Sequence, residues 1–469
     1  MYRLLYWLAP LMLLGACTPA APPNVVLIIV DDLGWIDTSV YGSEFYRTPN
    51  IDQLAAEGIR FTRFYAASPV CSPTRASLMT GRHPARLQIT NWIGGSQNAL
   101  LRQAHYQRQL PLHETTLGDA FKAAGYRTGY LGKWHLGAEG FRAGDQGFDY
   151  VRASNDAGQP GSYFAPYENP RFEISNVPDL EDDPDSTYLT DRLTDLAINF
   201  IERNQDQPFL LVLSYYNVHT PLEAKPALAK AFESASIADT HFTPEANDAM
   251  TRNAQDHADY AGMIASVDEN IGRLMAAFRE RNLSEHTTLM FTSDNGGLST
   301  LSNRRTWAPT SNRPLRAGKG WLYEGGIRIP LIIRTGSVRT DSTLGTTDDL
   351  MPTLLSLADI PLPDSLDGVN LLGDIPVERP LFWHFPHYHG SGNRPSGAVR
   401  TPRYKLVEWF EDGRAELYDL ARDPAETTDI SSDHPQLTDS LRTMLHNWRA
   451  GLQAQMPTPN PDYSPPTSR

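Results

Sequence analysis

The sequence is poor in cysteine and in basic residues, and it has no apolar run long enough for a stable transmembrane helix. Two cysteines among 469 residues exclude a disulfide-rich scaffold. The 41 lysines and arginines are outnumbered by 55 aspartates and glutamates, which gives a net charge of −14. Because nucleic-acid binding needs a basic surface to neutralise phosphates, this charge argues against a nucleic-acid partner. An anionic substrate would require the site to gather its own positive charges against the overall field.

The N-terminal segment has the features of an export signal. Arg3 supplies a positive charge, and residues 4–14 form an apolar region that is too short to span a membrane stably. Residues 14–17, with the sequence LGAC, resemble the lipobox of bacterial lipoproteins. This resemblance implies a signal peptide over 1–16, lipidation of Cys17 and a tether over 17–23; a plain secretory signal cut nearby is the alternative. Either reading places the mature protein outside the cytoplasm, and lipidation would anchor it in the periplasm or at the outer membrane.

Cys71 is left without a partner if Cys17 is removed or lipidated. An unpaired cysteine in an exported protein is either buried and inert or used chemically. The residues around Cys71 decide between these two cases.

Four apolar runs predict buried strands, and helical patterns lie between them. The runs cover 25–30, 209–214, 289–292 and 329–333, and the clearest helices cover 116–124 and 258–281. Strands that alternate with helices favour an α/β fold with a parallel sheet covered on both faces. In such sheets the ligand crevice lies beyond the carboxyl ends of the strands. Polar residues follow three of these strands: Asp31 and Asp32, then His219, then Asp294 and Asn295.

The character of the chain changes near residue 376. Short segments at 381–385, 398–399, 405–409 and 415–419 predict a small antiparallel sheet, followed by a helix over 436–449. We therefore expect a catalytic domain over 24–375, a C-terminal antiparallel subdomain over 376–455 and a disordered, Pro-rich tail over 456–469. The stretch 155–185, rich in Gly, Pro, Asn and Asp, predicts a surface insertion.

The strongest motif covers residues 71–82, with the sequence CSPTRASLMTGR. It resembles the signature of type I sulfatases, in the alkaline phosphatase superfamily; Thr74 stands where many members have serine. The resemblance implies a maturation enzyme that oxidises Cys71 to formylglycine. The hydrated aldehyde carries two hydroxyl groups: one attacks sulfur, and the other expels sulfate and restores the aldehyde. The family fold is a large mixed or parallel sheet between helices, with a smaller C-terminal antiparallel sheet.

Asp31, Asp32, Asp294 and Asn295 supply the hard oxygen ligands that calcium and magnesium prefer. The resemblance implies one divalent cation at these residues, with the group derived from Cys71 as a further ligand. These ligand types fit both metals, and the resemblance favours Ca²⁺ over Mg²⁺. The ion would polarise the sulfate and lower the pKa of the hydrate.

Two further blocks match the family: residues 132–137, GKWHLG, and residues 318–320, GKG. The resemblance assigns sulfate binding to Lys133 and Lys319, and pairing with the hydrate and sulfate to Arg75. It makes His135 the base for sulfate release and His219 the acid for the leaving alcohol. An extended segment would place Lys133 and His135 on one face. Together these residues would form a positive pocket inside an acidic protein.

Residues 384–394 are the candidate specificity segment. His387, His389 and Arg394 in this segment predict substrate contacts; an ordinary surface loop and the binding of adventitious metal are the alternatives. Trp92 and Trp307 are candidates for stacking on a sugar ring.

The sequence thus predicts a sulfatase that hydrolyses sulfate esters on a sulfated polysaccharide or oligosaccharide. Two alternatives stay open. One is a formylglycine-dependent phosphodiesterase or phosphonate monoester hydrolase of the same superfamily. The other is a non-catalytic glycan-binding lipoprotein in which Cys71 is never oxidised.

Overall fold

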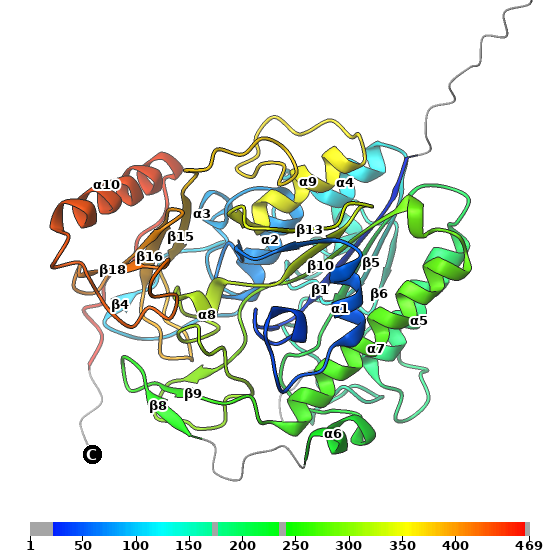
Figure 1. Ribbon diagram of the computed structural model, residues 1–469, viewed down its shortest axis with the longest axis horizontal. Coiled ribbons are helices and arrows are strands. Elements are labelled where there is room, and N and C mark those ends of the chain that lie inside the picture. The colour runs from blue at the N-terminus through cyan, green and yellow to red at the C-terminus, as the bar shows by residue number, and fades with distance from the viewer. Residues whose placement is uncertain (1–21, 171–176, 234–240, 465–469) are drawn as a thin grey trace, which may run out of the picture.

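The computed structural model describes residues 22–170, 177–233 and 241–464, and its centre is an eight-stranded sheet (Figure 1). The two strands beside β1 run parallel to it. The strands follow one another across the sheet in this order: β13 (Arg339–Asp341), β2 (Ile59–Phe61), β12 (Leu331–Arg334), β10 (Thr287–Ser293), β1 (Asn24–Val30), β7 (Phe209–Tyr215), β5 (Arg127–Gly132) and β6 (Tyr150–Arg152).

Strand β1 lies at the centre of the hydrophobic core because its side chains alternate between two helical layers. Val26, Ile28 and Val30 pack in one cluster with α1 (Pro49–Ala56), α5 (Leu189–Arg203) and α7 (Ala258–Glu280). Val25 and Leu27 pack in a second cluster with α2 (Cys71–Thr80), α4 (Leu117–Ala123) and α9 (Leu350–Leu357). The predicted α/β fold with helices on both faces is confirmed.

The sheet is mixed rather than parallel throughout. Strand β12 runs antiparallel to both β10 and β2, which corrects the prediction of a parallel sheet from the apolar runs. A continuous apolar run reports burial on both faces of a strand and carries no information about its direction. The long connection over 294–330 lets the chain enter the sheet from the opposite side.

Local capping signals place the helix ends close to their predicted positions. Thr116 caps α4 through its hydroxyl, which accepts from the backbone N–H of Asp119 at 3.1 Å, and the Asp119 carboxylate accepts from the N–H of Thr116 at 3.0 Å. Gly125 follows α4 with a φ of +86°, a conformation that glycine adopts without strain.

The C-terminal part forms the predicted antiparallel sheet, in the order β15-β16-β17-β18. These strands cover Leu381–Phe385, Ser396–Arg400, Tyr404–Trp409 and Ala415–Asp419, and α10 (Pro435–Leu452) packs against them through Leu441 and Leu445. The remaining helices are α3 (Pro84–Leu87), α6 (Pro226–Glu233) and α8 (Glu324–Ile327). The remaining strands are β3 (Phe64–Tyr65), β4 (Leu101–Arg102), β8 (Phe242–Pro244), β9 (Met250–Arg252), β11 (Thr300–Leu301), β14 (Gly345–Thr346) and β19 (Thr458–Pro459).

Two segments differ from the sequence-based expectation. The tail is ordered as far as residue 464, because β19 pairs with β4 and Asn460 N–H donates to Leu100 O at 3.0 Å; residues 465–469 lie outside the described part. The stretch 155–185 is more than a surface insertion, since Tyr163 and Tyr167 are fully buried. Composition predicted disorder for the tail and a surface insertion for 155–185. Strand pairing anchors the tail, and buried tyrosines pack the described part of 155–185, which leaves out 171–176, against the core.

The predicted signal peptide and most of the predicted tether, including Cys17, lie outside the described residues. Across the described ranges, no helix combines the length and the apolar character needed to cross a membrane.

Candidate active site

The carboxyl ends of four adjacent strands bring the predicted polar residues together. Asp31 and Asp32 follow β1, Asp294 and Asn295 follow β10, His219 lies beyond β7, and Lys133 follows β5. The backbone N–H of Asp32 donates to Asp294 Oδ1 at 3.1 Å, and Lys133 Nζ donates to Asp31 Oδ2 at 2.6 Å. The predicted crevice at this sheet edge is therefore present.

Cys71 is the first residue of α2 and lies beside this group. Its Sγ and a carboxylate oxygen of each of Asp31 and Asp32 lie within 4.8 Å of one another. Every residue of α2 is buried. Burial raises the pKa of the Cys71 thiol, so the unmodified side chain is a neutral thiol and a poor nucleophile.

Arg75 lies one helical turn after Cys71 and ties α2 to three strand ends. Its Nε donates to Asp294 Oδ2 at 2.8 Å. Its Nη1 donates to Lys133 O at 2.8 Å and to Ser214 Oγ at 2.7 Å. Long cationic side chains usually point into solvent. Arg75 is instead only 1% exposed, and its hydrogen bonds fix the orientation of α2.

The buried charges of the site balance by sign. Three carboxylates (Asp31, Asp32 and Asp294) face three cationic side chains (Arg75, Lys133 and Lys319). Lys319 Nζ donates to both oxygens of Asp32, at 2.7 and 2.9 Å. Burial acts to raise the pKa of Asp32, but the surrounding positive charges, led by Lys319, together outweigh it and hold that pKa below its ordinary value. Burial and the charge of Asp294 raise the pKa of Asp31.

The oxygen set fits a hard divalent cation. Asp31 Oδ1 and Asn295 Oδ1 are buried and accept no hydrogen bond from the described residues, although a buried acceptor without a partner is costly. Carboxylate and amide oxygens are the ligands that calcium and magnesium take. Asp31, Asp32, Asp294 and Asn295 are therefore the residues suited to hold the ion, and a dication there would leave the surrounding cations free to bind an anion.

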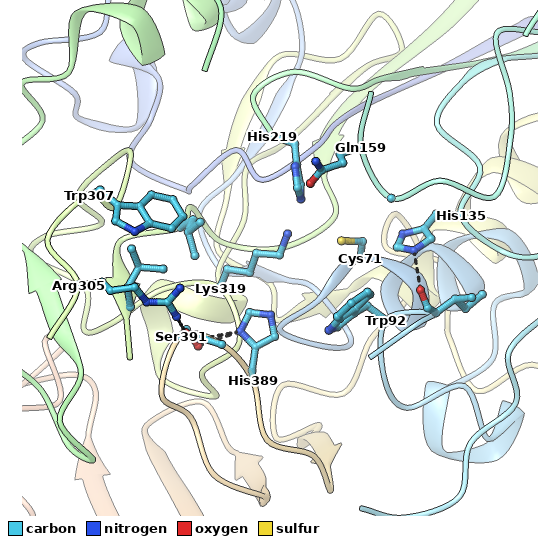
Figure 2. Close-up of a pocket in the computed structure, with 15 residues that line it drawn as sticks. Cys71, Trp92, His135, Gln159, His219, Arg305, Trp307, Lys319, His389 and Ser391 are labelled. Atoms are coloured by element: carbon cyan, nitrogen blue, oxygen red, sulfur yellow. Dashed lines mark hydrogen bonds between the residues drawn. The ribbon is translucent and has the colours of Figure 1, made fainter. Parts of the chain in front are cut away.

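The two candidate catalytic histidines approach the site from different elements (Figure 2). His219 Nδ1 donates to Thr220 O at 2.8 Å, which leaves Nε2 as the acceptor of the neutral ring, 3.7 Å from Asp32 Oδ2. Burial, followed by the charge of Lys319, lowers the pKa of His219 to about 3. His135 Nε2 donates to Ile93 O at 3.3 Å.

The expected extended geometry of residues 133–135 is wrong. His135 has a φ of +56°, so the chain turns between the two side chains instead of presenting both on one face. As a result, Lys133 is fully buried against Asp31, while His135 lines the open cavity. Sequence spacing could not reveal this turn because the residue is not a glycine.

These groups open into one cavity of about 400 Å³, within the range of small-molecule sites. Cys71, His135, His219 and Lys319 contribute to its wall (Figure 2). Trp92 and Trp307 also line it and are 36% and 51% exposed, as a stacking role requires.

The three candidate substrate-binding residues of the segment 384–394 have different surroundings. His389 lines the cavity as predicted. His387 is fully buried and pairs through Nε2 with Thr90 Oγ1 at 2.8 Å, so its predicted substrate contact is wrong. Arg394 pairs with Glu411 at 2.7 Å and lies outside the cavity lining. His387 and His389 are only two residues apart but have different surroundings, and a burial pattern cannot be read from a His-rich sequence.

Ser391, in the candidate specificity segment 384–394, also lines the cavity, although it was not singled out there. Gln159 and Arg305 line the cavity as well, and sequence reasoning missed both. They lie in loops without a motif, far from one another in the chain. Their only signal was their position within segments rich in glycine, serine and aromatic residues.

A cavity lined by the helix-borne Cys71, a fixed lysine and two histidines is suited to a hydrolase that acts on esters of an oxyanion. The sulfatase family model matches residues 23–360, and a second model, for the C-terminal part of N-sulphoglucosamine sulphohydrolase, matches residues 317–453. The chain belongs to the sulfatase family and is a sulfuric ester hydrolase.

Individual relatives agree over nearly the whole chain. A protein named sulfatase from Formosa agariphila is 29% identical over 92% of this chain and 88% of its own length. Human arylsulfatase A is 32% identical over 92% of this chain and 89% of its own length. The crystal structure of Ps i-CgsB in complex with k-i-k-neocarrahexaose has a TM-score of 0.72, with 27% identity over 91% of this chain and 92% of that one.

Proposed function

We propose that this sulfatase removes sulfate from a sulfated polysaccharide or oligosaccharide, using a formylglycine made from Cys71 and one bound calcium ion. The observation that carries this proposal is the placement of Cys71 at the start of α2, in the same cavity as Lys319, His135 and His219. Because burial keeps the thiol neutral, an unmodified cysteine would serve poorly here. The hydrated aldehyde supplies a nucleophilic hydroxyl, and the calcium ion supplies a positive charge that polarises the sulfate.

The three buried cations of the site have different roles when sulfate binds. Lys319 reaches the cavity and binds a sulfate oxygen directly. Lys133, buried behind the cavity wall, neutralises Asp31, and Arg75 neutralises Asp294 while holding α2 in place. Fixed charges of this kind stabilise negative charge in the transition state without reorganising.

The two histidines handle the protons. His219 Nε2 faces the site and carries no proton while the ring is neutral. The negative charge of a bound sulfate favours protonation of Nε2 from water, and Nε2 then delivers that proton to the departing alcohol oxygen. His135 lies on the cavity wall and takes a proton from the hydrate when sulfate leaves. Positioned acid–base groups of this type typically contribute about 10²- to 10⁴-fold to a rate.

A glycan fits the cavity better than a small aryl sulfate alone. Exposed tryptophans, Trp92 and Trp307, border the cavity and offer faces on which a sugar ring can stack. The complex of the related Ps i-CgsB holds a neocarrahexaose, an oligosaccharide. Export, lipidation at Cys17 and maturation by a formylglycine-generating enzyme complete the proposal and follow from the N-terminal sequence and the motif at 71–82.

The test measures free sulfate by ion chromatography from a panel of defined sulfated oligosaccharides. Enzyme matured with a formylglycine-generating partner is compared with Cys71→Ala prepared in the same way. Release that depends on Cys71 establishes the reaction and names the glycan. Matched phosphate esters of the same alcohols are included, and faster release of phosphate than of sulfate would contradict the proposal.

A further inference from the structure

Arg305 is a cationic side chain in the cavity that the sulfate-binding set does not use. It lies on the loop after β11 and lines the same cavity as Cys71 and Lys319 (Figure 2). Within the described ranges, its guanidinium pairs with no carboxylate, and its hydrogen bonds go to neutral acceptors. An unpaired cation at a binding surface is available to a ligand.

Neutral groups hold the Arg305 side chain in place. Its Nε donates to Ser302 O at 3.0 Å, and its Nη2 donates to Ser302 Oγ at 3.0 Å and Gly390 O at 2.9 Å. The guanidinium also lies 5.9 Å from the centre of the Trp307 ring. These hydrogen bonds use Nε and Nη2, which leaves Nη1 available to a ligand. The charge is therefore positioned without being neutralised, which is the arrangement that binds a carboxylate or a sulfate.

A tight turn over residues 389–391 connects Arg305 to the sulfate site. Gly390 accepts from Arg305, and the turn packs on the backbone beside Lys319: a β-carbon at Gly320 would lie 2.3 Å from Nδ1 of His389. The backbone N–H of Ser391 donates to that Nδ1 at 3.2 Å, so Nε2 carries the hydrogen of the neutral ring. Burial, followed by the charge of Lys319 and with a smaller contribution from Arg305, lowers the pKa of His389 to about 3.

We infer that Arg305 forms a second anion-binding position, so that the preferred substrate is a sulfated sugar with a second acidic group near the sulfate that is cleaved. The second group is an oxyanion, either the carboxylate of a uronic acid or another sulfate ester. This inference rests on the proposed function, because it specifies which sulfated glycan the cavity prefers. His389 lies between the two positions and donates a hydrogen bond to the sugar from Nε2.

A second anionic group is preferred because it would pair with the positive charge of Arg305, in a cavity that a single sulfate does not fill. A sulfate monoester carries one negative charge and occupies only the end of the 400 Å³ cavity near Lys319. A sugar ring that stacks on an exposed tryptophan would carry a second substituent toward Arg305. Hydrogen bonds to charged groups contribute enough for about a 10- to 100-fold preference.

The experiment compares matched sugars on the matured, full-length enzyme. Galactose, N-acetylgalactosamine and glucosamine 6-sulfates are each prepared alone, with a second sulfate, with a linked uronate and with the uncharged uronamide. The variant is Arg305→Met, which keeps a long side chain over Trp307 and removes the charge. The control is Arg304→Met, because Arg304 is exposed, pairs weakly with Asp248 at 3.8 Å and lies outside the cavity lining. Binding of the same sugars to Cys71→Ala, with and without Arg305→Met, is measured by calorimetry.

We expect wild type and Arg304→Met to prefer a doubly charged sugar by about 10- to 100-fold in kcat/KM, and Arg305→Met to lose that preference. The uronate–uronamide comparison and the disulfated sugar show which oxyanion is recognised. Release of sulfate without a preference for a second charge, or with a preference that survives Arg305→Met, would overturn the inference and leave the proposed function intact. Binding that depends on Arg305 without release of sulfate from any sugar would overturn the proposed function alone. Neither binding nor release would overturn both.

Discussion

Both Nε and Nη2 of Arg75 lie 2.8 Å from Oδ2 of Asp294, and both side chains are almost completely buried. The pair joins α2, which begins at Cys71, to the loop after β10. The same guanidinium holds Lys133 O and Ser214 Oγ, at the ends of β5 and β7. The helix that begins at Cys71 is thus fixed to the sheet through the buried Arg75 side chain.

Replacement of Arg75 by methionine is expected to lower the free energy of unfolding by about 3–5 kcal/mol, because it leaves Asp294 buried without its partner. Urea unfolding measures the change. Arg86→Met is the control, since Arg86 and Asp367 form a much more exposed pair, expected to contribute less than about 1 kcal/mol. An equal decrease in the free energy of unfolding of both variants would show that burial does not make the Arg75–Asp294 pair more important than the exposed pair.

Cys71 in enzyme matured with a formylglycine-generating partner is expected to lose about the mass of one water, as measured on the tryptic peptide. Cys71→Ala should show no such loss and should release sulfate at least about 10³-fold more slowly, because the nucleophile is gone. Thr74→Ser is the control: its hydroxyl donates to Ser68 O and Val70 O, which a serine hydroxyl can also reach, so conversion should continue. An unmodified Cys71 in fully active enzyme would contradict the formylglycine proposal.

Calcium is expected to stabilise the fold. A ligand at about 100 times its Kd adds about 2.7 kcal/mol to the free energy of unfolding. Unfolding is measured in EDTA, in calcium and in magnesium. Asp294→Asn should abolish the calcium-dependent increment, whereas Asp439→Asn, on the exposed side of α10, should retain it. An increment that persists in Asp294→Asn would place the ion elsewhere.

The buried carboxyl group of Asp348 should make the stability of the fold depend on pH. Burial and the adjacent charge of Asp349 raise its pKa to about 7, and its Oδ1 has no partner among the described residues. The folded state therefore binds this proton more tightly than the unfolded state does, where the pKa is about 3.9. Stability should fall as the pH rises from about 4 to 7, and the full cost should persist above pH 7.

Asp348→Asn should remove that cost. Relative to wild type, its free energy of unfolding should rise by about 1–3 kcal/mol more at pH 8 than at pH 4, as measured by urea unfolding at both values. Asp349→Asn is the matched control. Asp349 pairs with Arg379 at 2.7 and 2.9 Å, so the control should lose stability at pH 8. A gain in Asp348→Asn that is the same at both pH values would exclude titration as its cause.

Strand positions and motif residues were predictable because each depends on local chemistry. A run such as 25–30 is apolar because both faces of β1 are buried, and Thr116 with Gly125 marks the ends of α4. The direction of β12 was not predictable, since burial alone sets its composition. The pairing of β19 with β4 joins segments more than 350 residues apart, so no local signal could report it.

The sequence by itself determined the family, and it predicted the nucleophilic position at Cys71 and the oxygen ligands of a metal ion, because catalysis demands those residue types in fixed local patterns. Only the tertiary structure decided which side chains face the cavity. His387 turns into the core toward Thr90 while His389 faces the cavity, and Lys133 is buried beneath the site while His135 borders it. Arg305 likewise enters the site through contacts with Ser302 and Gly390. The orientation of a side chain depends on backbone turns and on distant packing partners, and a linear pattern encodes neither.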